Sequence, residues 1–299
     1  MRIAVLGGSG FLGSHVADAL SEAGHSVVIF DRVVSPWLRR GQEMVRGDIL
    51  DGEAVASAVA GAEAVYNFAG VAELDEADKS PVHSAEINII GNLQVCEACA
   101  RYKVRRYIFA STLYVYSRLG GAYRCSKQAC ETYIEYYRQT HGLEYTVLRY
   151  GSLYGPRSSA ANGIHHFIHQ AITAGRIDYY GNPDALREYI HVSDAALASV
   201  EVLQPEFVNR HVILSGNQAI RVSDLFHMIS EVLGKKIECL YHTGSLHYVT
   251  TPYSFNPQVG VKYSSRLHVD LGQGLLLKIE EIFHQNTDGR SPGDDGMGS

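Results

Sequence analysis

Short apolar runs alternate with amphipathic stretches along the first half of the chain. The apolar runs at residues 3–6, 26–30, 44–46, 64–68, 106–110 and 145–148 have the length of strands. One amphipathic stretch begins at Phe11, and three others cover residues 52–60, 83–102 and 123–141. Each of the four predicts a helix. Strands that are apolar throughout and alternate with helices are typical of a parallel sheet covered on both faces. The predicted fold class is α/β, a doubly wound parallel sheet that binds ligands at the carboxyl ends of its strands.

This regularity weakens after Pro156. Residues 158–182 predict a loop, a helix and a short strand, and residues 187–191 lead into a helix capped by Ser193 and Asp194. A strand at 212–214 and a helix at 222–233 follow. We expect a first domain at residues 1–157 and, at residues 158–285, most of a smaller C-terminal substrate-binding lobe interleaved with it. Residues 286–299, rich in Gly, Asp and Ser, predict a disordered tail.

Composition narrows the class of protein. A chain of 299 residues, of which 46% are hydrophobic, can bury a large core. The formal net charge of −6 provides no basic field for nucleic acid or an anionic membrane, so neither is predicted as a partner. No apolar run approaches the roughly 18 residues of a membrane span, and the first residues predict a strand rather than a secretion signal. These features predict a cytoplasmic protein.

The cysteines and histidines do not form a recognisable metal site. The number of cysteines, five, is odd, which favours reduced thiols over a disulfide framework. Cys96 and Cys99 form a C-x-x-C inside a predicted helix without a second pair, which favours core packing. His165, His166 and His169 lie at helical spacing, but no carboxylate or cysteine nearby completes a ligand set. No metal is predicted.

A glycine-rich turn follows the first predicted strand. Gly7, Gly10 and Gly13 stand between that strand and the helix beginning at Phe11, where backbone can approach a pyrophosphate and the helix N-terminus faces the phosphates. The second strand leads to Asp31, about 20 residues further on, whose carboxylate can accept both hydroxyls of an adenosine ribose. A 2′-phosphate would be repelled by Asp31, although the neighbouring Arg32 softens that effect. The pattern predicts a Rossmann-type sheet that binds NAD(H).

Three further residues indicate the reaction. Tyr123 and Lys127 form a Y-x-x-x-K that places both on one helix face, and Thr112 ends the strand at 106–110 together with Ser111. An unperturbed tyrosine, with a pKa of about 10, is a poor base at neutral pH. We expect Lys127 and the positive nicotinamide ring to lower the pKa of Tyr123, so that its phenolate can take a hydroxyl proton as hydride leaves. Thr112 would hydrogen-bond the same substrate oxygen.

Taken together, these motifs resemble the extended short-chain dehydrogenase/reductases, the NAD-dependent epimerase/dehydratase family that acts on nucleotide sugars. The resemblance covers nearly the whole chain. It rests on the three glycines, Asp31, residues 47–49, 66–70, 88–92 and 111–116, Tyr123 with Lys127, and residues 148–157 and 187–194. It implies NAD as the cofactor, a nucleotide-sugar substrate, and a homodimer in which the helices at 83–102 and 123–141 meet those of a second copy.

The resemblance also implies roles for individual positions. Thr112, Tyr123 and Lys127 would be catalytic, and Arg187 would meet the substrate diphosphate, which suits a guanidinium fork. The implied substrate contacts are Glu73, Ser111, Thr112, Ser152 and Arg187. The implied cofactor contacts are Gly7, Gly10, Phe11, Leu12, Gly13, Asp31, Arg32, Asp48, Ile49, Phe68, Ala69, Gly70, Asn88, Ala110, Tyr123, Lys127 and Tyr150.

The chain departs from the family in ways that bear on substrate and reaction. The segment between Thr112 and Tyr123 is about half as long as usual, which predicts an open side to the sugar pocket, and Ser152 stands where many relatives have an Asn. Dehydratases tend to follow the catalytic Thr with an Asp-Glu pair, and decarboxylases place a Glu two after it. Here those positions are Leu113 and Tyr114. Without a carboxylic acid there, elimination of water lacks its acid and base.

The leading hypothesis is therefore a nucleotide-sugar 4-epimerase that holds NAD tightly. The alternative is an NAD-dependent dehydrogenase or ketoreductase of a nucleotide sugar or another small alcohol, with the same Thr112, Tyr123 and Lys127. A dehydrogenase accumulates NADH, whereas an epimerase needs none. A third reading, an NAD-binding redox sensor that has lost catalysis, is disfavoured because Tyr123 and Lys127 are both present.

Overall fold

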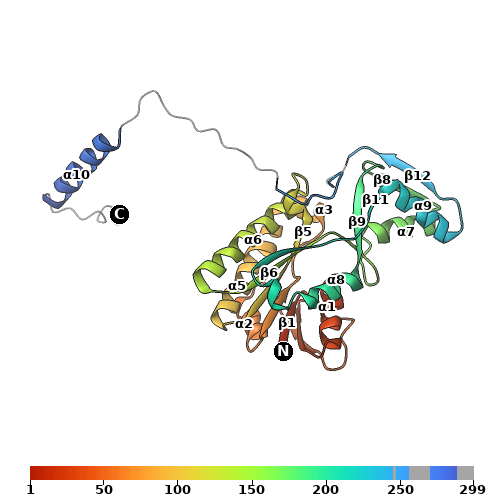
Figure 1. Cartoon of the computed structure of the whole chain (residues 1–299), viewed down its shortest axis with the longest axis horizontal. Helices are drawn as coiled ribbons and strands as arrows, with labels where there is room; N and C mark the ends of the chain where they lie inside the picture. Colours follow the sequence, from red (N-terminus) through yellow and green to blue (C-terminus); the bar gives the residue numbers. More distant parts are fainter. Residues whose placement is uncertain (245–246, 256–269, 288–299) are drawn as a thin grey trace, which may run out of the picture. The chain divides into compact units, whose positions relative to one another are not determined.

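Seven parallel strands form the central sheet of the computed structural model, which describes residues 1–244, 247–255 and 270–287 (Figure 1). The strand order is β10-β6-β5-β4-β1-β2-β3, as a doubly wound sheet requires. The prediction of the fold class is thus confirmed. The strands are β1 (Arg2–Leu6), β2 (Ser26–Asp31), β3 (Glu43–Arg46), β4 (Ala64–Asn67), β5 (Arg106–Thr112), β6 (Tyr145–Tyr150) and β10 (Arg210–Leu214).

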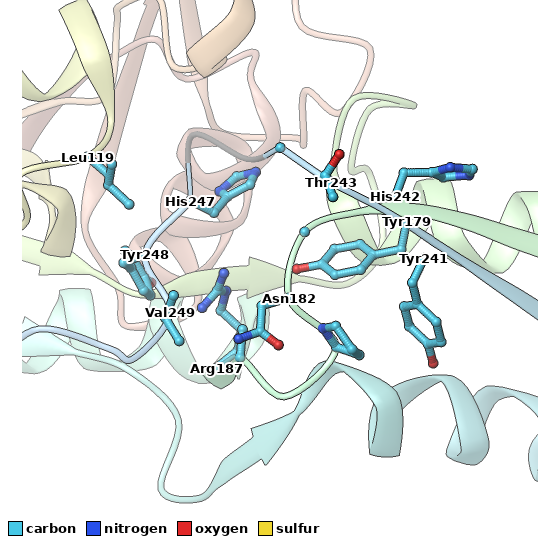
Figure 2. A pocket seen from close by; sticks show the side chains of 14 residues that line it. Leu119, Tyr179, Asn182, Arg187, Tyr241, His242, Thr243, His247, Tyr248 and Val249 are labelled. Atoms are coloured by element: carbon cyan, nitrogen blue, oxygen red, sulfur yellow. The ribbon is translucent and has the colours of Figure 1, made fainter.

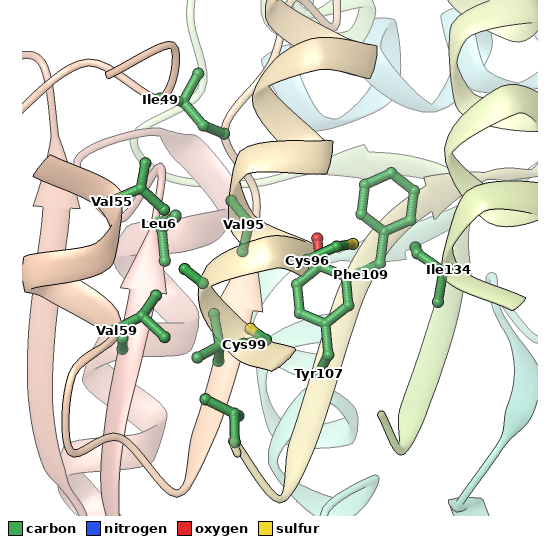
Figure 3. Close-up of a cluster of buried hydrophobic side chains, with 14 of the residues drawn as sticks. Leu6, Ile49, Val55, Val59, Val95, Cys96, Cys99, Tyr107, Phe109 and Ile134 are labelled. Atoms are coloured by element: carbon green, nitrogen blue, oxygen red, sulfur yellow. The ribbon is translucent and has the colours of Figure 1, made fainter. Parts of the chain in front are cut away.

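Helices cover both faces of this sheet because alternate strand residues point to opposite sides. On one face, Leu6, Tyr107 and Phe109 pack against α2 (Gly52–Val59), α5 (Gly91–Arg101) and α6 (Gly121–His141) (Figure 3). On the other face, residues such as Val5 and Ile108 pack against α1 (Phe11–Glu22) and α8 (Val192–Glu201). Two apolar cores therefore enclose the sheet.

The C-x-x-C motif belongs to the first of these cores. Cys96 and Cys99 are fully buried on α5, and burial raises the pKa of both thiols. All five cysteines are free thiols. The interpretation of the motif as core packing is confirmed.

The helix predicted at residues 83–102 is interrupted by a wider turn. It consists of α4 (Pro81–Ala85), a π-helical turn η1 (Glu86–Ile90) and α5. Asn88 lies in this turn, and its amide exchanges hydrogen bonds with the backbone N–H and C=O of Val71. Such π turns insert a residue and re-aim side chains, often at functional sites. Here the turn aims Asn88 at the loop that follows β4.

A smaller lobe is built from the later part of the chain. It contains β7 (Ser152–Tyr154), β9 (Leu186–His191) and β11 (Ala219–Arg221) in one sheet, and β8 (Arg176–Tyr180) with β12 (Glu238–His242) in another. Its core lies between these strands and α7 (Gly163–Ala174) and α9 (Val222–Leu233). A short turn, η3 (Pro205–Phe207), precedes β10, which returns to the central sheet. The central sheet and the smaller lobe are therefore interleaved along the sequence.

Two local predictions differ from the structure. Helix α8 begins at Val192, and its cap is His191, whose Nδ1 accepts from the backbone N–H of Ser193 at 3.3 Å. The predicted cap at Ser193 and Asp194 is wrong because the helix already starts at Val192, so that Ser193 and Asp194 lie inside its first turn. An additional helix, α10 (Leu271–Thr287), lies in a second compact unit, residues 257–299. It extends into the first two residues of the predicted tail, whose residues 288–299 lie outside the described residues.

None of the helices in the described part of the chain is long and apolar enough to cross a membrane.

Candidate active site

Close backbone contacts explain the glycines of the first turn. A Cβ on Gly7, whose φ is +76°, would lie 2.4 Å from the backbone nitrogen of Ala69, and a Cβ on Gly13 would lie 2.2 Å from the carbonyl oxygen of Gly7. The turn can therefore pack against the end of β4 and admit α1 only with glycine at these positions. Helix α1 begins at Phe11, and no side chain caps its N-terminus. Its free N–H groups form a cradle that suits a pyrophosphate.

Asp31 lies beside this cradle at the end of β2. Its carboxylate accepts hydrogen bonds from the backbone N–H of Ser9 at 3.0 Å and of Val33 at 3.2 Å. These two bonds orient the side chain, and each carboxylate oxygen keeps further acceptor capacity. Arg32 is exposed, and its carbonyl accepts from Nε of Arg46 at 2.9 Å. The arrangement fits the ribose contact that the sequence predicted.

We expect NAD(H) to bind at least about tenfold more tightly than NADP(H), a difference of about 1.4 kcal/mol, because Asp31 repels a 2′-phosphate. Isothermal titration with both cofactors measures this ratio. The Asp31→Ala variant should narrow it, and Asp48→Ala serves as the control at a second predicted cofactor position. Equal or tighter binding of NADP(H) by the unmodified protein would contradict the prediction.

The other predicted cofactor residues frame the same edge of the sheet. Asp48 caps its own turn through Leu50, and Ile49 is buried against Gly91. Phe68, Ala69 and Gly70 follow β4, and Ala110 lies in β5. Leu12 belongs to α1. Tyr150 is buried, with its hydroxyl 2.6 Å from Oγ of Ser199 on α8, so its polar end faces the core rather than the cradle.

Asn88 connects the loop after β4 to the helix that carries Tyr123. Besides its two bonds to Val71, its Nδ2 donates to Oγ of Ser126 at 2.9 Å. A Cβ on Gly70 would lie 2.7 Å from Oδ1 of Asn88 and 3.9 Å from Nζ of Lys127. Asn88 is buried and engaged with protein groups. In this structure it ties the loop to Ser126, the residue before Lys127, while direct contact with the cofactor stays a prediction.

Thr112, Tyr123 and Lys127 lie together at the carboxyl end of the sheet. Thr112 ends β5 and is close enough to Tyr123 to influence the pKa of its phenol, and Tyr123 lies in the first turn of α6. Lys127 lies one turn later, with its ammonium 5.8 Å from the centre of the Tyr123 ring. It donates to the carbonyl oxygen of Ala110 at 2.8 Å. The three residues that the sequence singled out thus share one location.

Burial governs the electrostatics of Tyr123 in the protein alone. Burial raises the pKa of Tyr123 to about 12, although the neighbouring hydroxyl of Thr112 acts to lower it. Burial also lowers the pKa of Lys127, whose ammonium is directed to Ala110. Among the protein groups, desolvation dominates the pKa of Tyr123, because the phenol lies in a low-dielectric environment. The expectation that Lys127 and the nicotinamide ring together lower this pKa stays a prediction for the NAD-bound protein.

Ser111 does not accompany Thr112 at the site. Successive strand residues point to opposite faces, and the hydroxyl of Ser111 donates to the buried carboxylate of Glu131. Glu131 also forms a bidentate ion pair with Arg149, with Nε–Oε1 and Nη2–Oε2 distances of 3.1 and 2.6 Å. Arg149 in turn donates to the hydroxyl of Tyr116. The predicted substrate contact of Ser111 is thus corrected to a supporting role behind the site.

A pocket of about 500 Å³ lies at the smaller lobe, and its lining includes Leu119 from the segment between Thr112 and Tyr123 (Figure 2). Arg187 is buried in its wall, which it shares with Tyr179. Within the described residues, no carboxylate forms an ion pair with Arg187. A buried guanidinium without a counter-charge is costly, so its place in a pocket indicates an anion-binding site. Tyr241, Asn182 and His242 line the same pocket.

The remaining predicted substrate residues border this region. Burial raises the pKa of Tyr248, while the neighbouring hydroxyl of Ser152 acts to lower it. Glu73 precedes α3 (Leu74–Lys79) and is close enough to Tyr123 to raise its pKa. The pKa of Glu73 is itself raised by partial desolvation and then by Glu76 and Asp75. Glu73 is therefore a candidate for a carboxylic acid at this site, because it is close to Tyr123 and its pKa is raised.

A segment that the sequence did not single out covers the open side of the pocket. Tyr114, in the short turn η2 (Leu113–Tyr116), hydrogen-bonds Nδ1 of His247, and its ring centre lies 4.9 Å from that of Tyr248. Phe255 packs against Tyr116 with ring centres 4.8 Å apart. Residues 247–255, here called the strap, thus occupy the side that the shortened loop was predicted to leave open. No local pattern marks the strap, because its role depends on a distant turn.

A parallel sheet with this glycine cradle, an acid after the second strand and a Thr–Tyr–Lys set is the architecture of an extended short-chain dehydrogenase/reductase. The chain belongs to the NAD dependent epimerase/dehydratase family, which residues 3–214 match. The predicted family and its cofactor, NAD, are thereby confirmed. The chain is an enzyme of this family.

Similar proteins include both epimerases and dehydratases. The structure of UDP-glucose 4-epimerase from Thermotoga maritima, solved with UDP-glucose, matches with a TM-score of 0.77 at 26% identity, over 96% of this chain and 100% of that chain. The enzyme of the same name from Thermus thermophilus, solved with NAD, gives a TM-score of 0.78 at 26% identity, over 87% and 95%. A dTDP-glucose 4,6-dehydratase from Streptomyces niveus is 28% identical over 68% of this chain and 69% of its own length.

Proposed function

We propose that this protein is a nucleotide-sugar 4-epimerase that uses NAD. The observation that carries the proposal is the meeting of Thr112, Tyr123 and Lys127 beside the glycine cradle, followed by Leu113 and Tyr114 rather than by carboxylic acids. General acid–base groups at a carbinol are present, whereas the positions that would serve an elimination hold an apolar and a phenolic side chain. The epimerase structures among the similar proteins support this choice.

The pocket supports a nucleotide-sugar substrate. Arg187 has the charge and the fork of N–H donors that a diphosphate needs, and aromatic rings line the pocket around it. UDP-glucose, which the Thermotoga maritima structure holds, has this chemistry. The diphosphate would bind Arg187 and the sugar would extend toward Tyr123.

Each residue of the site has a separate role in the proposed epimerisation. Tyr123 takes the proton of the sugar hydroxyl as a hydride leaves the same carbon, and it returns that proton after the ketone has presented its other face. NAD, when bound, accepts the hydride and gives it back, and its positive ring favours the phenolate. Thr112 holds the substrate oxygen through its hydroxyl, and Lys127 holds the ammonium charge near the phenol. Atoms and charge balance over the cycle, with no net NADH.

Heavy water separates this reaction from elimination. A 4-epimerase moves a hydride and a hydroxyl proton only, whereas a 4,6-dehydratase removes the proton at sugar carbon 5, which exchanges with solvent. We expect a panel of UDP-, GDP-, CDP- and dTDP-sugars in D₂O to give a 4-epimer with no deuterium at carbon 5 in the NMR spectrum. Reduced cofactor, measured by its absorbance, should not accumulate.

Deuterium at carbon 5, or a 4-keto-6-deoxy product, would overturn the epimerase proposal. It would direct attention to Glu73, the carboxyl group beside Tyr123. Accumulation of NADH in proportion to product would instead show a net dehydrogenase.

We also propose that the protein is a homodimer whose interface is formed by the helices at residues 83–102 and 123–141, which contain α5 and α6. Tyr133 and Tyr136 are exposed on α6, at 43% and 51% of their surface. Light scattering of the purified protein tests this proposal, and a monomeric mass would refute it.

A further inference from the structure

Arg187 is held in place from several sides. Its side chain is buried, its Nη1 donates to the carbonyl oxygen of Leu186 at 3.2 Å, and it shares the pocket wall with Tyr179. A long side chain that is immobilised before binding loses less conformational entropy when an anion arrives. The affinity for an anion then depends on the residue that fixes the orientation of the planar guanidinium group.

The ring of Tyr248 provides that plane. The guanidinium carbon of Arg187 lies 4.7 Å from the centre of the Tyr248 ring, within the range of a cation–π contact (Figure 2). A ring that takes one face of a guanidinium leaves its N–H edge available for hydrogen bonds. In Figure 2 both side chains border the pocket near Asn182 and Val249.

Tyr248 is itself fixed by its surroundings. It is 5% exposed, and its ring centre lies 4.9 Å from that of Tyr114. The next residue of the strap, Val249, accepts a hydrogen bond from the backbone N–H of Leu186 at 2.8 Å. The strap is thus paired with the residue that precedes Arg187, and the ring cannot move independently of that strand.

We propose that Tyr248 is a positioning residue that orients Arg187 for a diphosphate and thereby makes the pocket select nucleoside diphosphates over nucleoside monophosphates. The argument rests on the proposed function, because it takes the anion to be the diphosphate of a nucleotide sugar. A monophosphate presents only the phosphate next to the nucleoside. A diphosphate also presents the second phosphate, and the oriented fork adds its hydrogen bonds to that group.

Calorimetric titration of the NAD-loaded protein with UDP and UMP, and with dTDP and dTMP, tests the proposal through binding alone. We expect Tyr248→Leu to weaken binding of the diphosphate about tenfold, the value of a partly desolvated cation–π contact, and to change binding of the monophosphate less than about twofold. The Tyr248→Phe variant keeps the ring and should keep the ratio of the two affinities. Tyr253→Leu is the matched control, because Tyr253 lies on the same strap but is 50% exposed and is not among the residues that line the pocket, so the ratio should stay unchanged.

The result that overturns the proposal is an equal effect of Tyr248→Leu on both nucleotides, or no effect on either. Absence of any diphosphate preference in the unmodified protein would overturn it as well. Thermal unfolding of Tyr248→Leu, compared with Tyr248→Phe, separates a loss of fold from a loss of orientation. The proposed epimerase activity fails on a different observation, namely a diphosphate preference together with no conversion of any nucleotide sugar.

Discussion

Replacement of Tyr123 by phenylalanine is expected to lower turnover of the accepted nucleotide sugar at least about 100-fold, since general acid–base groups contribute about 10² to 10⁴ in rate. The ring stays in place, so α6 and the cofactor cradle should be unchanged. Steady-state kinetics measures the loss, and fluorescence titration with NADH checks that cofactor binding persists.

Tyr133→Phe is the control for this experiment. Tyr133 lies on the same helix but is exposed, and its hydroxyl has no place in the proposed reaction. Thr112→Ala should lose less activity than Tyr123→Phe, because it removes one hydrogen bond rather than the group that moves the proton. Near-normal turnover by Tyr123→Phe would show that another residue is the acid–base group.

The second large effect is expected on stability. Glu131→Gln removes the carboxylate that pairs with buried Arg149 and accepts from Ser111. Breaking one partner of a buried ion pair leaves an uncompensated charge, so the free energy of unfolding should fall by about 3–5 kcal/mol. Denaturation with urea, followed by circular dichroism, measures this change.

Glu135→Gln provides the matched control one turn further along α6. Its carboxylate lies 3.3 Å from Nε2 of His211 but is 49% exposed, and such pairs contribute about 0–1 kcal/mol. If Glu131→Gln changed the free energy of unfolding no more than Glu135→Gln does, the buried pair would not support the end of β5.

The strands and helices of the central sheet could be predicted because their signal is local. Each strand is a short apolar run, and each helix repeats its apolar positions every three or four residues. The residues after the strands follow from topology, since the carboxyl ends of parallel strands meet at one edge. Thr112 was found in this way, Tyr123 and Lys127 were found from their spacing on one helix face, and the structure places all three together. The glycine cradle was found likewise, and close backbone contacts at Gly7 and Gly13 give its physical reason.

Other features depended on packing that no local pattern records. Ser111 and Thr112 are neighbours in sequence, yet the strand turns one toward Glu131 and the other toward Tyr123. The pKa of Tyr123 depends on how strongly its phenol is desolvated, which follows from the whole environment and not from the spacing of Lys127. The side chain of Asn88, in the π turn, bonds the backbone at Val71, 17 residues earlier in the chain, and spacing alone does not predict that contact.

The sequence by itself determined the family, the sheet, the cofactor class and the residues proposed for proton transfer, because each depends on short motifs and on the periodicity of strands and helices. Only the tertiary structure decided how the pocket is closed. Arg187, Tyr248 and Tyr114 come from β9, the strap and η2, and their contacts exist only after these segments fold together. The physical reason is that burial, desolvation and the orientation of a charged side chain are set by neighbours in space, which residue spacing along the chain does not specify.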